Sequence, residues 1–591
     1  MKKELEMEKT WDLSILYEGF DDEKYKKDEQ LLTEAIAKLG KLALECDAIG
    51  EEALLCDYIK TSAEINELAG KLIIYCNLRY SACTADSEAA SNLGKLLGMM
   101  SDTAAPSAKI SKMIASFADI EKYIAGNELL AEHAYLLRNI VRDSKYLLSE
   151  GEETVFAKMS ISGAQAWEDL HSSLTSSVKV LYEGKEITLS AVRNLAYDPD
   201  PTVRRKAYEA ELTAYDSIKD AVAFALNSIK LQVLNECAMR GYESPLAKSL
   251  YTSRMSRATL DALIGAMEEY LPVFRKYLKA KARALGHEGG LPWYDLFAPL
   301  GSSTKTYTTE DAKEYLLGIF GKADAELHDM VKCAFENRWI DFYPRENKVG
   351  GAFDCGVSSA KQSRVLTNFD GSFSDIVTLA HELGHAFHDK QVFRNGVLNQ
   401  DYSMPVAETA STFNEVLVCE NAIAGAESDD ERLALIEGQL CDACQIITDI
   451  YSRYTFETSV FEHRPEEFMS ADRMCELMLA AQKKAYGDGL DENVMHPYMW
   501  LCKGHYYSGS LSFYNFPYAF GGLFARGLYA KYKKEGAAFF DTYKEMLRRT
   551  PLADIEDCAA IAGVDLTDRE FWRAGLETIA EQIDQFCELV K

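Results

Sequence analysis

Apolar residues recur at three- and four-residue spacing through long stretches of this chain, with polar positions between them. Two such stripes are Ile65, Leu68, Leu72 and Tyr75, and Ile218, Val222, Ala225, Ile229 and Val233. This period is typical of a helix that buries one face. Only 13 prolines interrupt the 591 residues, so long helices can persist. The pattern predicts a mostly α architecture in which these stripes form core.

Two segments depart from the helical period. Between about residues 338 and 370, alternating apolar positions and β-branched residues are punctuated by Gly, Pro and Asn, and the segment ends at Asp370-Gly371. This combination predicts short strands and a small β-sheet. The second segment, from Gly504 to Gly522, is rich in glycine and tyrosine.

The length of the chain exceeds what one hydrophobic core usually supports, which predicts two lobes. The run from Asp198 to Pro201 can end one helix and cap the next. We therefore expect an N-terminal helical lobe over residues 1–195 and a second region over residues 196–591.

The net charge of the chain is −29, from 64 basic and 93 acidic side chains. Nucleic acids and anionic membranes would be repelled, so neither is expected as a partner. The start, Met1 to Glu6, is not followed by an apolar stretch of signal-peptide length, and no run of 18 apolar residues occurs. These features predict an acidic cytoplasmic protein.

The run His381-Glu382-Leu383-Gly384-His385 fits the zinc-peptidase pattern HExxH. On a helix, positions i and i+4 lie about 40° apart around the axis, so both imidazoles can reach one metal ion. Glu382 is then placed to handle a proton beside the metal. We expect this helix to be capped by Ser374 or Asp375, and to present His388 on the same face as the two histidines.

A third ligand is required, because catalytic zinc usually has three protein ligands and one position for water. Pro405 can start a helix that carries Glu408 and Glu415, seven residues apart and therefore nearly on one face. Either Glu408 binds the metal or both carboxylates are solvated; the spacing leaves both readings open.

Three segments together resemble the oligoendopeptidase F group, which belongs to the thimet oligopeptidase family of zinc metallopeptidases. They are Lys348–Phe353, Leu366–Phe369 and Thr378–His388. Both ends of the chain, at Trp11–Leu13 and at Ala562–Trp572, also resemble that group. The resemblance implies a helical body of two lobes, with a deep channel between them and zinc on the channel floor. It also implies that short, unstructured peptides are the substrates.

Several site residues follow from this resemblance. It places Glu408 as the third zinc ligand beside His381 and His385, and Gly351 and Phe353 as substrate contacts. We expect one zinc ion per chain.

The segment His505 to Tyr518 resembles the part of the family that contacts the substrate and its oxyanion. Without the resemblance, tyrosines among glycines are as typical of packing or of a surface loop as they are of a substrate-binding site. With it, Tyr518 and His505 become the expected oxyanion donors, since phenol and imidazole groups can donate hydrogen bonds to developing negative charge. Tyr514 and Tyr507 become expected substrate contacts, and the choice between Tyr514 and Tyr518 as donor stays open.

These features predict a zinc endopeptidase in which Glu382 takes a proton from the attacking water and returns it to the departing amine. Glu415 either orients a ligand histidine or is a plain carboxylate on the helix face. The substrate backbone is expected to pair with an edge strand over Ser363 to Phe369.

Two other functions remain open. A dipeptidyl carboxypeptidase would need a cation near the site for the terminal carboxylate, and residues 500–522 offer only Lys503 besides His505. A peptide-binding scaffold without turnover would have no need of Glu382. The sequence does not indicate an oligomeric state.

Overall fold

The computed structural model of the chain describes residues 10–302 and 305–591. The start of the chain from Met1 to Glu6, on which the expectation about a signal peptide rests, lies outside these ranges. Within them, no helix combines the length and the apolar character needed to cross a membrane.

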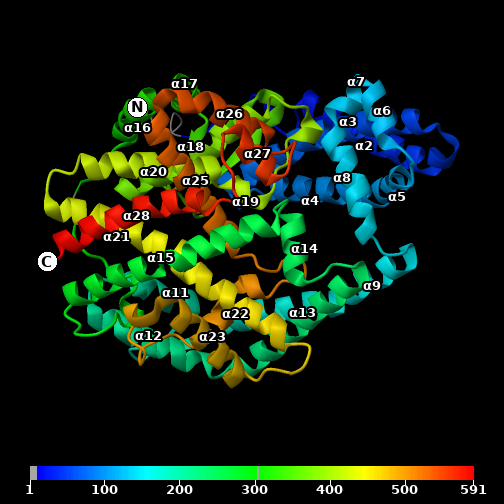
Figure 1. Cartoon of the computed structure of the whole chain (residues 1–591). Coiled ribbons are helices and arrows are strands. Elements are labelled where there is room, and N and C mark those ends of the chain that lie inside the picture. The colour runs from blue at the N-terminus through cyan, green and yellow to red at the C-terminus, as the bar shows by residue number, and fades with distance from the viewer. Residues whose placement is uncertain (1–9, 303–304) are drawn as a thin grey trace. The chain divides into compact units, whose positions relative to one another are not determined.

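The architecture is mostly α, as predicted, and its strands are few and short (Figure 1). Both apolar stripes lie in long helices, α3 (Glu51–Ala82) and α13 (Lys219–Arg240). Their stripe residues are buried, which confirms that they form core. Helix α3 packs along α2 (Glu23–Glu45).

The chain divides into two compact units, each assembled from three stretches. Unit 1 comprises residues 1–145, 305–418 and 531–563, and unit 2 comprises residues 146–304, 419–530 and 564–591. This division differs from the lobes expected over 1–195 and 196–591, because segments distant in sequence pack together within each unit.

Besides a small sheet, unit 1 contains further helices. They are α4 (Ser87–Ser101), α5 (Ala104–Ala115), α6 (Ile120–Gly126), α7 (Glu128–Glu132), α8 (Ala134–Asp143), α16 (Thr309–Ala323), α17 (Ala325–Glu336), α18 (Phe373–Val392), α19 (Met404–Ala407), α20 (Thr409–Ala424), α26 (Phe539–Arg549) and α27 (Ile555–Ile561). The second stretch of unit 1 ends within α20, at Val418.

Unit 2 consists of helices and one hairpin. The hairpin pairs β1 (Lys179–Tyr182) with β2 (Lys185–Thr188) in antiparallel fashion. The helices besides α13 are α9 (Glu150–Ser162), α10 (Ala164–Ser177), α11 (Leu189–Asn194), α12 (Pro201–Tyr215), α14 (Pro245–Thr252), α15 (Arg257–Ala284), α21 (Asp429–Cys444), α22 (Ile450–His463), α23 (Ala471–Tyr486), α24 (Met499–Cys502), α25 (Phe516–Glu535, to Ala530 in this unit) and α28 (Arg569–Leu589).

The sheet of unit 1 has three strands in the order β3-β5-β4. Strand β3 (Ile340–Asp341) pairs in parallel with β5 (Gln362–Leu366), and β4 (Phe353–Val357) pairs with β5 in antiparallel fashion. The prediction of short strands in this segment is confirmed. The prediction of an edge strand over Ser363 to Phe369 is wrong, because β5 is the central strand and has a partner on each side.

Candidate metal and catalytic site

Helix α18 carries the HExxH motif and is fixed at its start by a capping box. The Ser372 hydroxyl accepts from the Asp375 backbone, and the Asp375 carboxylate accepts from the Ser372 backbone in return. The helix therefore begins two residues earlier than a cap at Ser374 would place it. Its apolar stripe Ile376, Ala380, Leu383 and Phe387 is buried. The helix packs on β4, β5 and α26, which leaves its polar face to carry the motif.

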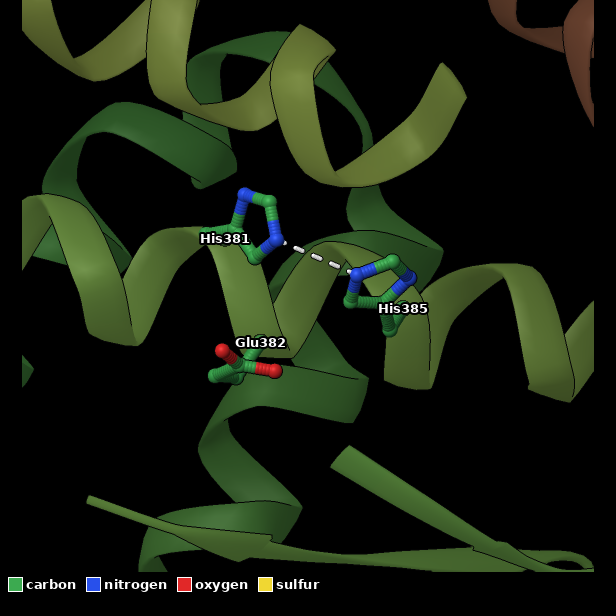
Figure 2. Close-up of side chains that lie close together, drawn as sticks. All are labelled: His381, Glu382 and His385. Carbon is green, nitrogen blue, oxygen red and sulfur yellow. Dashed lines mark hydrogen bonds between the residues drawn. The ribbon is translucent and has the colours of Figure 1, made fainter. Parts of the chain in front are cut away.

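Three donor atoms converge on that polar face. The Nε2 atoms of His381 and His385 lie 3.1 Å apart, and Figure 2 shows the two imidazoles turned toward each other. Oε2 of Glu408 lies 3.3 Å from each of these nitrogens. The three side chains are half-buried. Glu382 adds a carboxylate oxygen to the same cluster.

The triangle fits a zinc ion. Nitrogen and oxygen ligands bind zinc at about 2.0–2.2 Å in tetrahedral geometry, so any two of them lie roughly 3.4 Å apart. The observed separations of 3.1 and 3.3 Å match one face of such a tetrahedron. Two imidazoles and one carboxylate are also the donor types that zinc prefers.

The electrostatics of the cluster favour a cation. Burial alone would lower the pKa of His381, but Glu408 and Glu415 outweigh it and raise that pKa to about 10. Burial alone would likewise raise the pKa of Glu408, yet His381 and His385 hold it well below its usual range. The carboxylates thus stabilise positive charge at the place where the three donors meet.

Outer contacts orient two of the three donors. Nδ1 of His381 lies 2.5 Å from a carboxylate oxygen of Glu415, and the Ser411 hydroxyl donates to Glu408 at 2.8 Å. A carboxylate on the second ring nitrogen fixes the tautomer and ring orientation of a metal-binding histidine. Of the two readings left open for Glu415, the geometry therefore supports the orienting one.

The chain turns sharply at Glu408. Pro405 lies in the first turn of the short helix α19, as predicted for a helix start, and α19 ends at Ala407. Glu408 follows as its C-cap, and α20 begins at Thr409. Glu408 therefore reaches the histidines from a junction between two helices, and Glu415 from the second turn of α20.

Gly384 allows α20 to approach α18 closely. A Cβ atom at this position would lie 2.5 Å from the carbonyl oxygen of Ala410 and 2.5 Å from Cα of Ser411. Both are backbone atoms of the helix that follows Glu408. We expect Gly384→Ala to push the two helices apart, to destabilise the protein by about 1–3 kcal/mol, and to lower its metal content. Thermal unfolding and elemental analysis of the purified variant measure both effects.

The matched control for that variant is Gly94→Ala. Gly94 lies in helix α4 of the same unit, and a Cβ atom there meets nothing within 4 Å. Alanine at an exposed helix position is favoured over glycine by about 1 kcal/mol, so this variant should be neutral or slightly stabilised. Equal behaviour of the two variants would show that close helix approach at Gly384 does not matter.

Glu382 lies in a dry environment beside the donors. It is only 7% exposed. Burial raises the pKa of its carboxyl group, and the Asp354 backbone in β4 lowers it by a smaller amount. The raised pKa suits a group that must both accept and return a proton.

Two acidic residues near Glu382 were not predicted from the sequence. Asp354 and Asp389 lie side by side and are half-buried, and desolvation raises the pKa of both, that of Asp389 to about 6. Two adjacent carboxylates do not both ionise readily, so the pair holds a proton at neutral pH. Asp389 follows His385 by four residues on α18, and this helical spacing was the available signal.

His388 does not join the metal donors. It is buried, its Nε2 lies 2.8 Å from the Thr550 hydroxyl, and its ring stacks on Tyr402. Burial lowers the pKa of this imidazole to about 3, so it is neutral. His388 lies seven positions after His381 and so falls on the same side of the helix, as predicted, but its imidazole packs against Thr550 and Tyr402 and does not join the metal donors.

In unit 2, the structure brings His505, Tyr514 and Tyr518 together. The ring of His505 stacks on Tyr518 at 5.8 Å and meets Tyr514 edge-on at 5.3 Å. Partial desolvation and the nearby cations Arg453 and Lys503 lower the pKa of His505. At neutral pH the imidazole is therefore neutral and can donate one N–H.

A buried ion pair binds the segment that carries Tyr514 and Tyr518. Nζ of Lys230 lies 2.7 Å from one oxygen of Glu457, and both side chains are 1% exposed. The other Glu457 oxygen accepts from the amide of Asn515, between Tyr514 and Tyr518, at 2.8 Å. A fully paired buried charge specifies its surroundings tightly, because breaking it leaves an uncompensated charge.

Tyr507 lies apart from that cluster. It is 1% exposed, stacks on His171, and donates its hydroxyl hydrogen to the Trp500 carbonyl. These are the contacts of a packing residue. Gly522 lies within helix α25, where a Cβ atom would lie 2.4 Å from a side-chain carbon of Ile446, so this glycine permits close helix packing.

The two predicted substrate contacts of unit 1 lie at the start of β4. Gly351 is exposed, has a φ of +80°, and its carbonyl accepts from the Asn368 amide at 2.8 Å. Phe353 is half-buried, and its ring lies 6.2 Å from that of Trp11. Phe353 is the first residue of β4, and Gly351 precedes that strand by two residues.

Comparison with known proteins decides the family. A sequence profile described as Peptidase family M3 matches residues 194–578, and one described as Oligopeptidase F matches residues 115–179. The chain belongs to peptidase family M3. The first match begins next to the boundary expected near residue 195.

Known M3 relatives align along the whole chain. Oligopeptidase PepF of Bacillus subtilis is 25% identical over 604 residues, which cover 100% of this chain and 88% of that protein. A solved structure from Chlamydophila abortus superposes with a TM-score of 0.86 at 21% identity, over 98% of both chains. Oligoendopeptidase-F from Enterococcus faecium gives a TM-score of 0.70 at 18% identity, over 96% of this chain and 99% of that one.

These matches confirm three predictions about the M3 chain. The resemblance to oligoendopeptidase F is confirmed, as are the mostly helical fold and the assignment as a metalloendopeptidase. The role of each site residue remains a prediction.

Proposed function

We propose that this M3 peptidase is a zinc-dependent endopeptidase that hydrolyses internal bonds of short, unstructured peptides. The observation that carries the proposal is the triangle formed by His381, His385 and Glu408 beside the buried carboxylate of Glu382. Names of relatives such as Oligoendopeptidase F support the substrate class.

One zinc ion held by these three side chains would supply the electrophilic chemistry, by lowering the pKa of water to about 7 and polarising a carbonyl oxygen. The residues around the triangle prepare it for that ion. Glu415 fixes the ring of His381, Ser411 fixes the carboxylate of Glu408, and Gly384 permits the close approach of the two helices.

Glu382 is the proton carrier. As the attacking water adds to the scissile carbonyl carbon, its proton passes to the Glu382 carboxylate, and Glu382 then donates that proton to the departing amine nitrogen. The burial of Glu382 keeps bulk water away from its carboxylate during both transfers.

His505 and Tyr518 are the proposed donors to the oxyanion. Both groups are neutral at pH 7 and each carries a hydrogen suited to an oxygen on which negative charge develops. The Lys230–Glu457–Asn515 network supports this assignment, because it fixes the segment that carries Tyr514 and Tyr518.

Tyr518→Phe tests that role. The substitution removes one hydroxyl and keeps the ring that stacks on His505. Loss of one oxyanion donor should lower kcat by about 10²-fold with little change in KM. Metal content should be unchanged. Steady-state kinetics on a quenched fluorescent peptide give both constants.

Tyr514→Phe is the matched comparison, since Tyr514 contacts the same imidazole. We expect it to raise KM more than it lowers kcat. A large fall in kcat for Tyr514→Phe, with Tyr518→Phe near wild type, would exchange the two roles.

The substrate is proposed to run along β4 and not along β5. Among the described residues, β4 has a strand partner on one side only, and its residue Asp354 contacts Glu382. Main-chain pairing with an edge strand binds a peptide largely irrespective of its side chains. Broad tolerance of substrate sequence follows from this mode of binding.

A peptide blocked at both ends tests the proposed function. The metal-loaded enzyme should cut it at internal bonds, and mass spectrometry should find two blocked fragments. A dipeptidyl carboxypeptidase would cut only the version with a free C-terminus, and a scaffold would cut neither.

A further inference from the structure

Unit 2 contains a cavity of about 320 Å³ that plays no part in the chemistry above. Its walls come from α11, α12, the turn at Trp293–Asp295, and the segments around Gln445 and Met499. This volume lies at the lower end of the range, about 300–1,000 Å³, of small-molecule sites.

The cavity is positively charged, in a chain whose net charge is −29. Its lining includes Arg193, Arg204 and Lys503 but a single carboxylate, Glu211. Arg204 is neutralised by a buried pair with Asp295 at 2.8 Å. Arg193 is paired with Glu211 at 3.5 Å but keeps further N–H groups that a ligand can meet, as does the ammonium group of Lys503.

Lys503 is the cation without a counter-ion. Within the described part of the chain, its ammonium group makes no hydrogen bond and no ion pair. Burial lowers its pKa, and the positive charges of Arg453 and Arg193 lower it further. The acidic neighbour Asp449 is already paired with Arg453. An anion in the cavity would relieve the repulsion between Lys503 and Arg193.

The single carboxylate of the lining is already satisfied. Glu211 accepts from the Tyr215 hydroxyl at 2.7 Å and lies 3.5 Å from Nη1 of Arg193. Burial alone would raise its pKa, but His496, Arg193 and Tyr215 outweigh it and hold the pKa at about 2. Glu211 therefore positions Arg193 and does not compete for a cationic ligand.

His496 is a buried imidazole with one ring nitrogen left without a partner. It is 1% exposed and lines the cavity. Its Nε2 faces Glu211 at 3.4 Å, which is a long contact, and its Nδ1 makes no hydrogen bond among the described residues. Buried polar groups are almost always paired, so the unpaired Nδ1 beside a cavity indicates a ligand.

The rest of the wall is aromatic, and one part of it has an unusual backbone. The aromatic lining residues are Tyr197, Tyr208, Trp293, Tyr294 and Phe297. Residues Gln445–Asp449 form a π-helix, which brings Gln445 to the cavity and Asp449 to Arg453. Single π-turns within α-helices occur frequently at functional sites.

We propose that this cavity binds the C-terminal carboxylate of a peptide with an aromatic last residue, the carboxylate pairing with Lys503 and Arg193. The aromatic wall receives the side chain, and His496 bonds to the terminal peptide group. The inference rests on the proposed function for the nature of its ligand, since a peptidase meets peptide ends as substrates and as products. Lys503 lies two residues before His505, so the bound end adjoins the segment proposed to contact substrate.

Calorimetric titration of the wild-type protein with N-acetylphenylalanine and with its amide tests this site without hydrolysis. The acid should bind at least about 10-fold more tightly than the amide, because a charge-assisted pair is lost in the amide. Lys503→Met should abolish this preference, and Lys483→Met, which removes an exposed lysine of the same unit, should preserve it. A thermal melt of each variant reports folding.

Two further arms identify the ligand and its location. A pentapeptide ending in phenylalanine should displace the acid, and its amidated form should not. The affinity of the acid should survive removal of zinc by a chelator. Equal affinity of wild type for acid and amide, a preference that persists in Lys503→Met, failure of the pentapeptide acid to compete, or loss of binding with the zinc would each overturn the proposal. None of these outcomes depends on whether blocked peptides are hydrolysed.

Discussion

Replacing Glu382 by glutamine should lower kcat by about 10²–10⁴-fold while leaving the metal in place. The amide has the same shape as the carboxylate but cannot accept the proton of the attacking water at neutral pH. Glu382 is not one of the three atoms in the donor triangle, so zinc binding does not require it. Hydrolysis of a quenched peptide, measured beside the zinc content of the same preparation, separates catalysis from metal binding.

Glu336→Gln is the control for that experiment, because it removes an exposed carboxylate of the same unit. It should match wild type in rate and in metal content. Glu382→Gln with more than a tenth of wild-type activity and full zinc occupancy would refute the proposed role as proton carrier.

Removal of the third ligand should have the second large effect. In Glu408→Ala only two imidazoles remain, and the anionic donor that lies 3.3 Å from each of them is lost. Loss of an outer partner of a metal ligand typically costs about 10–100-fold in affinity. Loss of a direct ligand should therefore weaken zinc binding by more than about 100-fold. Competition with a chromophoric chelator measures the affinity.

Glu415→Gln provides an internal scale for this loss. Glu415 contacts Nδ1 of His381 and is not part of the donor triangle. Its removal should therefore weaken zinc binding by about 10–100-fold, the range for outer partners of a metal ligand. The expected order of zinc affinity is wild type, then Glu415→Gln, then Glu408→Ala. The reverse order of the two variants would mean that Glu415 is the ligand and Glu408 the orienting residue.

The metal helix could be predicted because its geometry is local. Within one helix, the four-residue spacing of His381 and His385 fixes how the imidazoles lie, and the apolar stripe fixes which side packs. The same spacing placed His388 on that side of the helix, but its contacts depend on Thr550 and Tyr402, which are distant in sequence.

Glu408 could not be assigned by spacing alone, because no continuous helix joins it to Glu415. The chain breaks between α19 and α20 at this residue, and the approach of α20 depends on the absence of a side chain at Gly384. The family resemblance supplied the residue, and the distances to His381 and His385 give it a physical reason.

Neither the order of the strands nor the cavity of unit 2 could be predicted from the sequence, because both depend on contacts between distant segments. Alternating residues predicted the strands correctly. They do not show which strands pair, so the edge strand was expected at β5, which is the central strand of the sheet. Arg193 and Lys503 are separated by about 310 positions in the sequence, and only folding brings them to one cavity.

Titration of zinc into chelated protein, with cleavage of a doubly blocked peptide as the readout, tests the central claim most directly. We expect negligible activity without metal, a linear rise as zinc is added, and a plateau at one ion per chain. Cleavage that persists in the fully chelated protein, or protein that binds zinc and never cleaves the peptide, would contradict it.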